Sequence, residues 1–333
     1  MKIYDVGVMA LGMAGQAQVE AFAKNPRTRV KAVCTRDEDV LRDTCERHGI
    51  DVACQSFDDL LSAGLDVVVI CTPDHLHVEY AAAALQAGLH VVCEKPLATS
   101  LDDVRELVNL TRRTDRLFMT GQCARFFARS QFARGLIDRG ELGSIFFAEA
   151  DYLHDIADFL RGWRVDPESP QDIVLGGGCH PLDLLRWLVG DVDEVHGVAN
   201  KMVFPDSNPM TSDCALLSLK FVSGAIGKCV VSVGCQRPYS LGLSLYGDAG
   251  TMVDDMLHLA SDEGDEFADT PLGAQAHDGA DLFGDQAQHL VECLDAGRQP
   301  MADAVEGAKT VATCLAGAES IRTGRPVKVC NDF

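Results

Sequence analysis

A lysine stands directly after one of the most apolar stretches of this 333-residue chain. Residues 90–95 read HVVCEK, so Lys95 would lie at the carboxyl end of a buried strand. Open parallel sheets keep their ligand crevice at that end of the strands. A cation after an apolar strand is costly to place there unless its charge has a function. Lys95 is therefore the first candidate for catalysis.

A second candidate site is the segment ALGMAG, which follows a predicted strand and opens a predicted helix. This is the context of a G-x-G-x-x-G motif with alanine in the first position. Gly12 would let the backbone approach a pyrophosphate, Gly15 would let the helix pack closely, and the helix N-terminus would supply N–H groups. The alternative is a glycine-rich packing turn. We expect the dinucleotide to contact Ala10, Gly12, Met13, Ala14 and Gly15. The turn can form with alanine in the first position if the φ of Ala10 is negative.

The second predicted strand ends just before Thr35 and Arg36. A site that prefers NAD usually has an acidic side chain at the Thr35 position, for the ribose 2′-hydroxyl. A hydroxyl and a guanidinium instead suit a 2′-phosphate, so the sequence favours NADP, with NAD possible. In the NAD alternative Arg36 is merely solvated and Asp37 or Asp39 faces the ribose. We interpret Asp37 as a helix N-cap.

A histidine precedes a further helix predicted at Pro181–Leu188. Proline is favoured in a first helical turn, so His180 would lie at or near the helix cap. A base with a pKa near neutral suits proton transfer at physiological pH. Asp183, three residues on, or Asp155 or Asp172 from elsewhere, could orient His180. The alternative for His180 is a capping or packing role.

Other polar side chains are weaker candidates. Tyr152 and His154 follow a strand and could reach a substrate, although such a cluster can also be an ordinary polar edge. Arg125 could contact an anion or a hydroxyl. Trp163 and Arg164 could touch cofactor or substrate, or form a surface aromatic–cation stack.

The elements that must position these residues fall into two groups. Residues 1–122 alternate short apolar strands with helices, which indicates parallel βαβ units and an α/β dinucleotide-binding (Rossmann) domain. The strands are predicted at Tyr4–Met9, Val30–Cys34, Val67–Cys71, His90–Cys93 and Leu117–Thr120, and the helices at Met13–Lys24, Glu38–His48, Leu76–Ala87 and Leu101–Thr114.

Residues 123–333 have a different pattern, which predicts an α+β domain with a largely antiparallel open sheet. Helices are predicted at Phe127–Arg139, Pro181–Leu188 and Gln286–Ile321, and the acidic stretch Ser261–Asp285 is expected to be an exposed loop. Strands are predicted at Ile145–Leu153, Val192–Val203, Cys214–Val222, Ala225–Val233 and Leu241–Tyr246.

Composition excludes several classes of partner. The net charge of −21 argues against binding to nucleic acid or to an anionic membrane surface. No apolar run reaches the roughly 18 residues of a transmembrane helix. The 13 cysteines are scattered without a C-x-x-C pair, which favours a reducing, cytoplasmic location and offers no metal-ligand spacing. No serine or cysteine nucleophile motif is present.

The chain resembles the glucose–fructose oxidoreductase and inositol dehydrogenase (GFO/IDH/MocA) family. The resemblance spans essentially the whole chain. It is carried by VGVMALGMAG, ICTPDHLHVEYAAAALQAGLHVVCEKPLA, the pair Trp163-Arg164, GGGCHPLDLLRWLVG and AESIRTGRPVKV. It implies a second domain whose open sheet forms a homodimer or homotetramer interface.

The resemblance also implies roles for single residues. Thr72, Pro73 and His77 would lie near the ribose and pyrophosphate, although His77 could instead be a helix-face histidine satisfied by its neighbours. Glu94 would approach the nicotinamide ribose, and the Lys95–Pro96 peptide would be cis. Family members commonly carry an aspartate four residues before the histidine base, but this chain has Gly176 there.

We therefore expect reversible hydride transfer between nicotinamide and a secondary alcohol or ketone of a sugar, cyclitol or related polyol. His180 would take the hydroxyl proton, and Lys95 would stabilise the alkoxide or relay the proton. Both, with Arg125, Tyr152 and His154, would contact substrate. One alternative is a non-catalytic nucleotide sensor on the same fold. Another is an NAD-dependent glycosidase.

Overall fold

A computed structural model describes residues 1–166, 172–205, 210, 212–261, 264, 266–272 and 281–333. They form two compact units. The first comprises Met1–Cys123, Asp281–Ala308 and Phe333, and the second comprises Ala124–Ala280 and Lys309–Asp332. Residues 281–308, which the sequence prediction placed in the second domain, thus belong by their contacts to the first unit.

The first unit is built on a six-stranded parallel sheet in the order β3-β2-β1-β4-β5-β6. The strands are β1 (Tyr4–Met9), β2 (Thr28–Cys34), β3 (Val52–Cys54), β4 (Val67–Ile70), β5 (His90–Cys93) and β6 (Phe118–Thr120). All four residues of β4, VVVI, are buried, as expected for a central strand with both faces covered. The predicted Rossmann sheet is confirmed, while β3 was not predicted.

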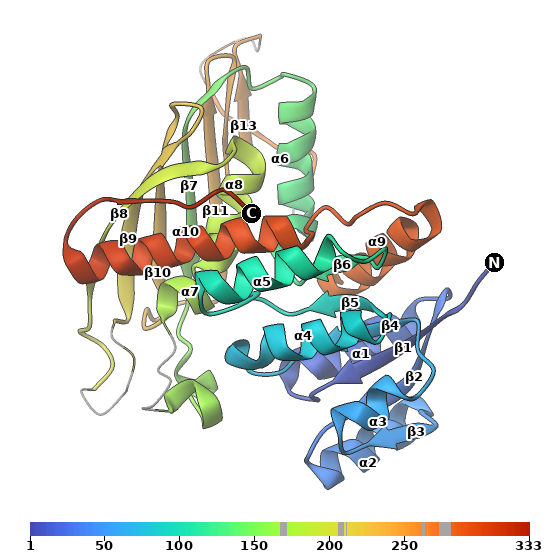
Figure 1. Ribbon diagram of the computed structural model, residues 1–333. Helices are drawn as coiled ribbons and strands as arrows, with labels where there is room; N and C mark the ends of the chain where they lie inside the picture. Colours follow the sequence, from blue (N-terminus) through green and yellow to red (C-terminus); the bar gives the residue numbers. More distant parts are fainter. Residues whose placement is uncertain (167–171, 206–209, 211, 262–263, 265, 273–280) are drawn as a thin grey trace. The chain divides into compact units, whose positions relative to one another are not determined.

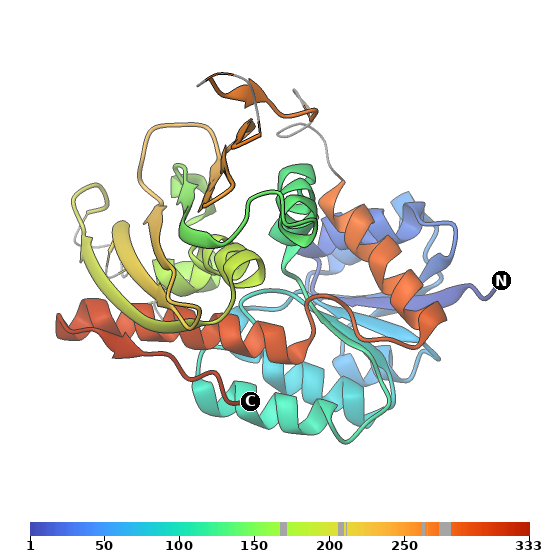
Figure 2. The same ribbon diagram turned by 90° about the horizontal axis from the view of Figure 1, so that it is seen from above.

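Helices cover both faces of this sheet. They are α1 (Met13–Lys24), α2 (Glu38–His48), α3 (Phe57–Leu61), α4 (His77–Gln86), α5 (Leu101–Thr111) and α9 (Leu282–Ala296). Helices α4 and α5 pack together, and α1 packs with α2 and α9. Figure 2 shows these two groups on opposite sides of the strands. Helix α9 returns from the far end of the chain, which explains why local patterns did not assign it to this unit.

The second unit is built on a nine-stranded mixed sheet in the order β14-β13-β12-β11-β7-β10-β9-β8-β15. Among the strand pairs of the described residues, only that of β10 with β7 is parallel, so the prediction of a largely antiparallel sheet is confirmed. The strands are β7 (Ile145–Leu153), β8 (Val192–Asn200), β9 (Cys214–Phe221), β10 (Ile226–Ser232), β11 (Ser240–Gly247), β12 (Gly250–Val253), β13 (Met256–Leu259), β14 (Ala268–Asp269) and β15 (Val327–Lys328).

Helices of the second unit are α6 (Ala128–Asp138), α7 (Ile173–Gly176), α8 (Cys179–Val189) and most of α10 (Ala304–Thr323), seen in Figure 1. Alternate residues of β7, Ala148 and Ala150, are buried on the side that α8 covers. On the opposite side, Val198, Leu216 and Ile226 are exposed. Among the residues that the structure describes, these side chains leave part of that face of the sheet uncovered.

Two predicted segments differ in the structure. The single helical region expected over Gln286–Ile321 is two helices, because α9 ends at Gly297, whose φ of +61° is left-handed. The acidic stretch expected to be a loop lies partly outside the described residues, and its last residues already belong to α9. Within the described residues, every helix is too short or too polar to span a membrane.

Candidate active site

The turn between β1 and α1 carries a strained alanine. Ala10 has φ +69°, so the expectation of a negative φ is wrong. Its N–H donates to the carbonyl of Cys34 at 2.8 Å, which fixes the turn against β2. A Cβ built on Gly15 would lie 1.9 Å from the carbonyl oxygen of Ala10. The left-handed turn therefore aims this carbonyl at the helix, and only glycine fits at position 15.

The same turn leaves room for a ligand. Gly12 has no atom within 4 Å of a built Cβ, and Met13 beside it is exposed. Helix α1 begins at Met13, and no side chain caps its N-terminus. On the adjacent β4 end, the buried hydroxyl of Thr72 has no partner among the described residues. Free N–H groups, open space and an unused hydroxyl fit the phosphates and ribose of a dinucleotide.

At the end of β2, the acidic side chains are already engaged. The carboxylate of Asp37 accepts the N–H groups of Asp39 and Val40, each at 3.1 Å, so the predicted N-cap is confirmed. The carboxylate of Asp39 accepts from Arg42 at 2.6 Å. Arg36 is exposed beside them.

A buried carboxylate lies at the end of β5. Glu94 is 8% exposed, and its Oε1 accepts from the Nε2 of Gln18 on α1 at 3.1 Å. The same Nε2 lies 3.5 Å from Oε1 of Gln286 on α9, so the returning helix supports this end of the sheet. Lys95 follows, half-buried, and the Lys95–Pro96 peptide is cis, as the resemblance implied.

His77 holds two loops together. It is 1% exposed, and its Nδ1 and Nε2 lie 2.7 and 2.9 Å from the carbonyl oxygens of Pro96 and Thr72. These carbonyls follow β5 and β4, so the imidazole joins the ends of neighbouring strands. Both ring nitrogens are engaged by the protein, which matches the alternative of a histidine satisfied by its neighbours. Pro73 directly follows Thr72 and precedes a short 3₁₀ turn at Asp74–Leu76.

The second unit groups the other predicted side chains into an aromatic cluster. The ring of His180, on the first turn of α8, stacks on Tyr152 of β7 with centroids 5.7 Å apart. The Nε2 of His154 lies 2.8 Å from the Tyr152 hydroxyl. Tyr239 packs edge-on against both Tyr152 and His154, at 5.7 and 5.2 Å. Burial lowers the pKa of His154 below its usual range, which favours its neutral form.

The expected roles of Asp183 and Arg125 are corrected. Both side chains are fully buried, and Arg125 donates to Asp183 through Nε at 2.7 Å and Nη2 at 2.8 Å. The hydroxyl of Thr310 on α10 donates to the same carboxylate at 2.9 Å. This buried ion pair and its hydrogen bond connect α8, α10 and the 3₁₀ turn at Cys123–Phe126. It does not offer a guanidinium to a substrate or a free carboxylate to His180.

The other two acids considered for His180 are also engaged elsewhere. Asp172 caps α7 by accepting the N–H of Val174 at 2.7 Å, and burial raises its pKa. Asp155 accepts from Gln236 at 2.6 Å. The ring of His180 stacks on Tyr152 with an interplanar angle of 17°, a contact that helps to orient the imidazole.

Trp163 and Arg164 form the aromatic–cation stack that was considered as the alternative. They lie in a 3₁₀ turn at Gly162–Val165, with the guanidinium carbon 4.5 Å from the ring centroid. A contact with cofactor stays a prediction. Among the described residues, no group of three or more His, Cys, Asp or Glu side chains could hold a metal ion.

Sequence reasoning missed Tyr239, Gln18 and Gln286. Tyr239 follows Arg237-Pro238 in a connection before β11, and its position after a proline gave no signal that it returns to β7. The two glutamines are buried in helices, where only the folded contacts reveal that one of them holds Glu94.

Comparisons with known proteins agree with this architecture. Residues 4–122 match the model of an oxidoreductase family with an NAD-binding Rossmann fold, and residues 130–253 match the GFO/IDH/MocA C-terminal domain. The chain is 26% identical over 293 residues to 1,5-anhydro-D-fructose reductase of Ensifer adhaerens, covering 85% of each chain. It is 24% identical to myo-inositol 2-dehydrogenase of Thermotoga maritima, covering 97% of this chain and 98% of the relative.

Among solved structures, a levoglucosan dehydrogenase in complex with NADH superposes with a TM-score of 0.90 and 21% identity, over 99% of this chain and 100% of the other. At that identity the likeness shows the fold alone. The two family models together span most of both units, and the resemblance carried by the Lys95 and His180 motifs is confirmed. This chain belongs to the GFO/IDH/MocA family of NAD(P)-dependent oxidoreductases.

Proposed function

We propose that this enzyme catalyses reversible hydride transfer between a nicotinamide cofactor and a secondary alcohol or ketone of a sugar, cyclitol or related polyol. The observation that carries the proposal is Lys95 at the carboxyl end of β5, directly after the buried carboxylate of Glu94. That edge of a doubly wound sheet is where ligands bind. Two relatives, a reductase of 1,5-anhydro-D-fructose and an inositol dehydrogenase, support the substrate class.

The side chains of the protein position the substrate and the cofactor and stabilise the charge that develops during the reaction. The nicotinamide, when bound, supplies the hydride chemistry. In the direction of oxidation, a ring nitrogen of His180 accepts the hydroxyl proton. The ammonium of Lys95 stabilises the negative charge that develops on the substrate oxygen, or relays the proton. Glu94, held by Gln18, orients the ribose next to the reacting ring.

Lys95→Met tests the assignment. The change removes the charge but keeps much of the side-chain length, so turnover should fall by at least about 100-fold, while nucleotide binding, followed by fluorescence titration, survives. Lys24→Met is the matched control, since Lys24 is exposed on α1 and pairs only with Glu20 in the structure's described part. Near-normal turnover in Lys95→Met would remove Lys95 from the mechanism.

We also propose a preference for NADP. Asp37 and Asp39 are engaged in a helix cap and an ion pair, and Arg36 lies exposed next to Thr35. A guanidinium can pair with a 2′-phosphate, which gains charge-assisted hydrogen bonds. Arg36→Ser should raise the KM for NADP by about tenfold or more and leave the KM for NAD nearly unchanged. An equal effect on both cofactors would contradict the preference.

Two other functions for the same fold make different predictions. A nucleotide sensor would bind NADP without oxidising any sugar, cyclitol or polyol of a broad panel. An NAD-dependent glycosidase would release nitrophenol from a nitrophenyl glycoside without net formation of reduced nicotinamide. The family relatives named as dehydrogenases and reductases favour plain hydride transfer.

The open face of the second sheet supports self-association as a homodimer or homotetramer. Val198 and Leu216 are cross-strand partners on β8 and β9, and Ile226 lies on the same face of β10. Exposed apolar side chains over adjacent strands are typical of an interface. Leu216→Lys should lower the molar mass measured by light scattering, while Ile3→Lys, at an exposed residue of the first unit, should not.

A further inference from the structure

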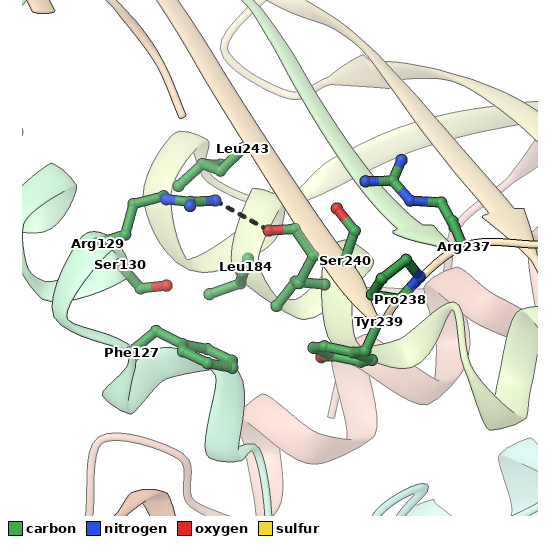
Figure 3. A pocket seen from close by; sticks show the side chains of 10 residues that line it. Phe127, Arg129, Ser130, Leu184, Arg237, Pro238, Tyr239, Ser240 and Leu243 are labelled. Carbon is green, nitrogen blue, oxygen red and sulfur yellow. Dashed lines mark hydrogen bonds between the residues drawn. The ribbon is translucent and has the colours of Figure 1, made fainter. Parts of the chain in front are cut away.

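A pocket lies in the second unit, between the start of α6, helix α8 and the chain that leads into β11 (Figure 3). Its volume is about 260 Å³. That is slightly less than the roughly 300 Å³ at which pockets for small ligands begin, which suits one ring better than an extended chain. It is lined by Phe127, Arg129, Ser130, Leu184, Arg237, Pro238, Tyr239, Ser240, Leu241 and Leu243.

The pocket adjoins the aromatic cluster through one shared residue. Tyr239 lines the pocket, and its ring centroid lies 5.7 Å from that of Tyr152 and 5.2 Å from that of His154. Tyr152 in turn stacks on His180. The pocket therefore begins one aromatic ring away from the side chains proposed to hold the reacting alcohol. A substrate longer than one ring could reach from that cluster into the pocket.

The walls are neither purely apolar nor strongly charged. Arg129 is 5% exposed and forms ion pairs with Asp254 and Asp255, each at 2.9 Å, so its charge is balanced. Its Nη1 also donates to the carbonyl of Leu241 at 3.1 Å, which fixes it as part of the wall. Arg237 is exposed at the rim. A polyanion would gain little here, and a hydrocarbon would leave the polar wall groups without partners.

Aromatic and hydroxyl groups occupy separate parts of the pocket. Figure 3 shows the rings of Phe127 and Tyr239 on opposite sides of one end of the pocket, and the hydroxyl of Ser130 directed toward Leu184. Sugar rings have apolar C–H faces, which pack on aromatic rings, and hydroxyl edges, which need hydrogen-bond partners. The pocket offers both kinds of surface at the scale of one such ring.

We propose that this pocket binds a second, neutral sugar ring attached to the ring or polyol that is oxidised, so that the substrate is a disaccharide or a glycosylated polyol. This proposal rests on the proposed function and names its substrate class more narrowly. The reacting unit lies at the cluster of His180 and Tyr152, and the attached ring lies between Phe127 and Tyr239.

The test compares one-ring and two-ring ligands in the full-length enzyme with NADP present. Maltose, cellobiose, lactose and melibiose are measured beside glucose, galactose and myo-inositol, by turnover and by titration calorimetry. Leu241→Trp places an indole in the pocket from a half-buried strand position. Arg237→Ala removes a rim donor at an exposed site. Val222→Trp, at an exposed residue after β9, is the size-matched control.

We expect at least one disaccharide to exceed every single-ring sugar in kcat/KM by tenfold or more. Leu241→Trp should abolish that advantage, and Arg237→Ala should reduce it by about threefold to tenfold, the effect of one lost hydrogen bond. Arg237→Ala should keep single-ring turnover within about twofold, since Arg237 is exposed at the rim of the pocket. Leu241 is the cross-strand partner of Tyr152, so Leu241→Trp is judged by the ratio of two-ring to single-ring kcat/KM. Val222→Trp should behave as the wild type.

The outcomes separate this proposal from the proposed function. Oxidation of single-ring sugars with no binding of any disaccharide overturns the second-ring pocket and leaves the proposed function intact. An unchanged disaccharide preference in both Leu241→Trp and Arg237→Ala also overturns it. Disaccharide binding that is lost in Leu241→Trp, in an enzyme that oxidises none of the sugars, supports the pocket and contradicts the hydride-transfer function. If Leu241→Trp does not fold, Arg237→Ala decides the result.

Discussion

Ala10→Gly should stabilise this protein, although it removes a methyl group. Ala10 adopts φ +69°, a left-handed conformation that costs a residue with a Cβ about 1–2 kcal/mol. Glycine adopts this conformation without that cost, but its unfolded chain has more freedom, which costs about 0.4–1 kcal/mol. The difference predicts a gain of about 0.5–1 kcal/mol in the free energy of unfolding.

The assay is equilibrium unfolding in urea without nucleotide, followed by circular dichroism. Ala17→Gly on α1 is the matched control, because the same change in the interior of a helix should cost about 1 kcal/mol. The two variants should therefore differ by roughly 1.5–2 kcal/mol with opposite signs. Nucleotide affinity should change little in Ala10→Gly, since the backbone path that aims the Ala10 carbonyl at Gly15 is retained. Equal losses of stability in both variants would refute the strain argument.

Three further predictions follow from single contacts. Gly15→Ala should destabilise the fold by about 1–3 kcal/mol, because its Cβ would meet a backbone carbonyl oxygen at 1.9 Å. Gly12→Ala has open space around its Cβ, so it should keep the stability of the fold and lose nucleotide affinity in a fluorescence titration. Arg125→Met should cost about 3–5 kcal/mol by leaving the buried carboxylate of Asp183 without its ion-pair partner, and adding Asp183→Leu should restore part of that loss in urea unfolding. Burial lowers the pKa of His289 below its usual 6.5, so the unfolded chain takes up this proton at a higher pH than the folded chain. The stability that this histidine contributes above about pH 6.5 is lost as the pH falls toward the folded pKa, at up to about 1.4 kcal/mol per pH unit. His289→Gln should therefore lose less free energy of unfolding than the wild type between about pH 7.5 and about pH 5.5.

The first unit was largely predictable because its signals are local. Strands such as β4 and β5 are short runs of apolar residues that are buried on both faces, and helices such as α2 and α5 begin at the side-chain caps Asp37 and Ser100. β3 was missed because it is three residues long and half exposed, so its pattern does not differ from that of a loop.

The candidate site was predictable as a set of residue types but not as a set of contacts. The spacing of three residues between His180 and Asp183 suggested that the acid could orient the base. In the folded chain that acid instead meets Arg125, 58 residues earlier, and Thr310, 127 residues later. Helical periodicity places neighbours on one helix, but it says nothing about which distant element covers each face.

The three acids considered as partners of His180 are all engaged with other groups. Gly176 offers no side chain, and Asp183 is committed to a buried ion pair that fastens α8 to other elements of its unit. The imidazole stacks on Tyr152, whose hydroxyl lies 2.8 Å from His154. A carboxylate would stabilise the imidazolium once the proton has been taken, whereas an aromatic ring mainly fixes its orientation. In the proposed mechanism the ammonium of Lys95, at the end of β5, stabilises the charge that develops on the substrate oxygen, and Lys95→Met is the variant that measures its contribution.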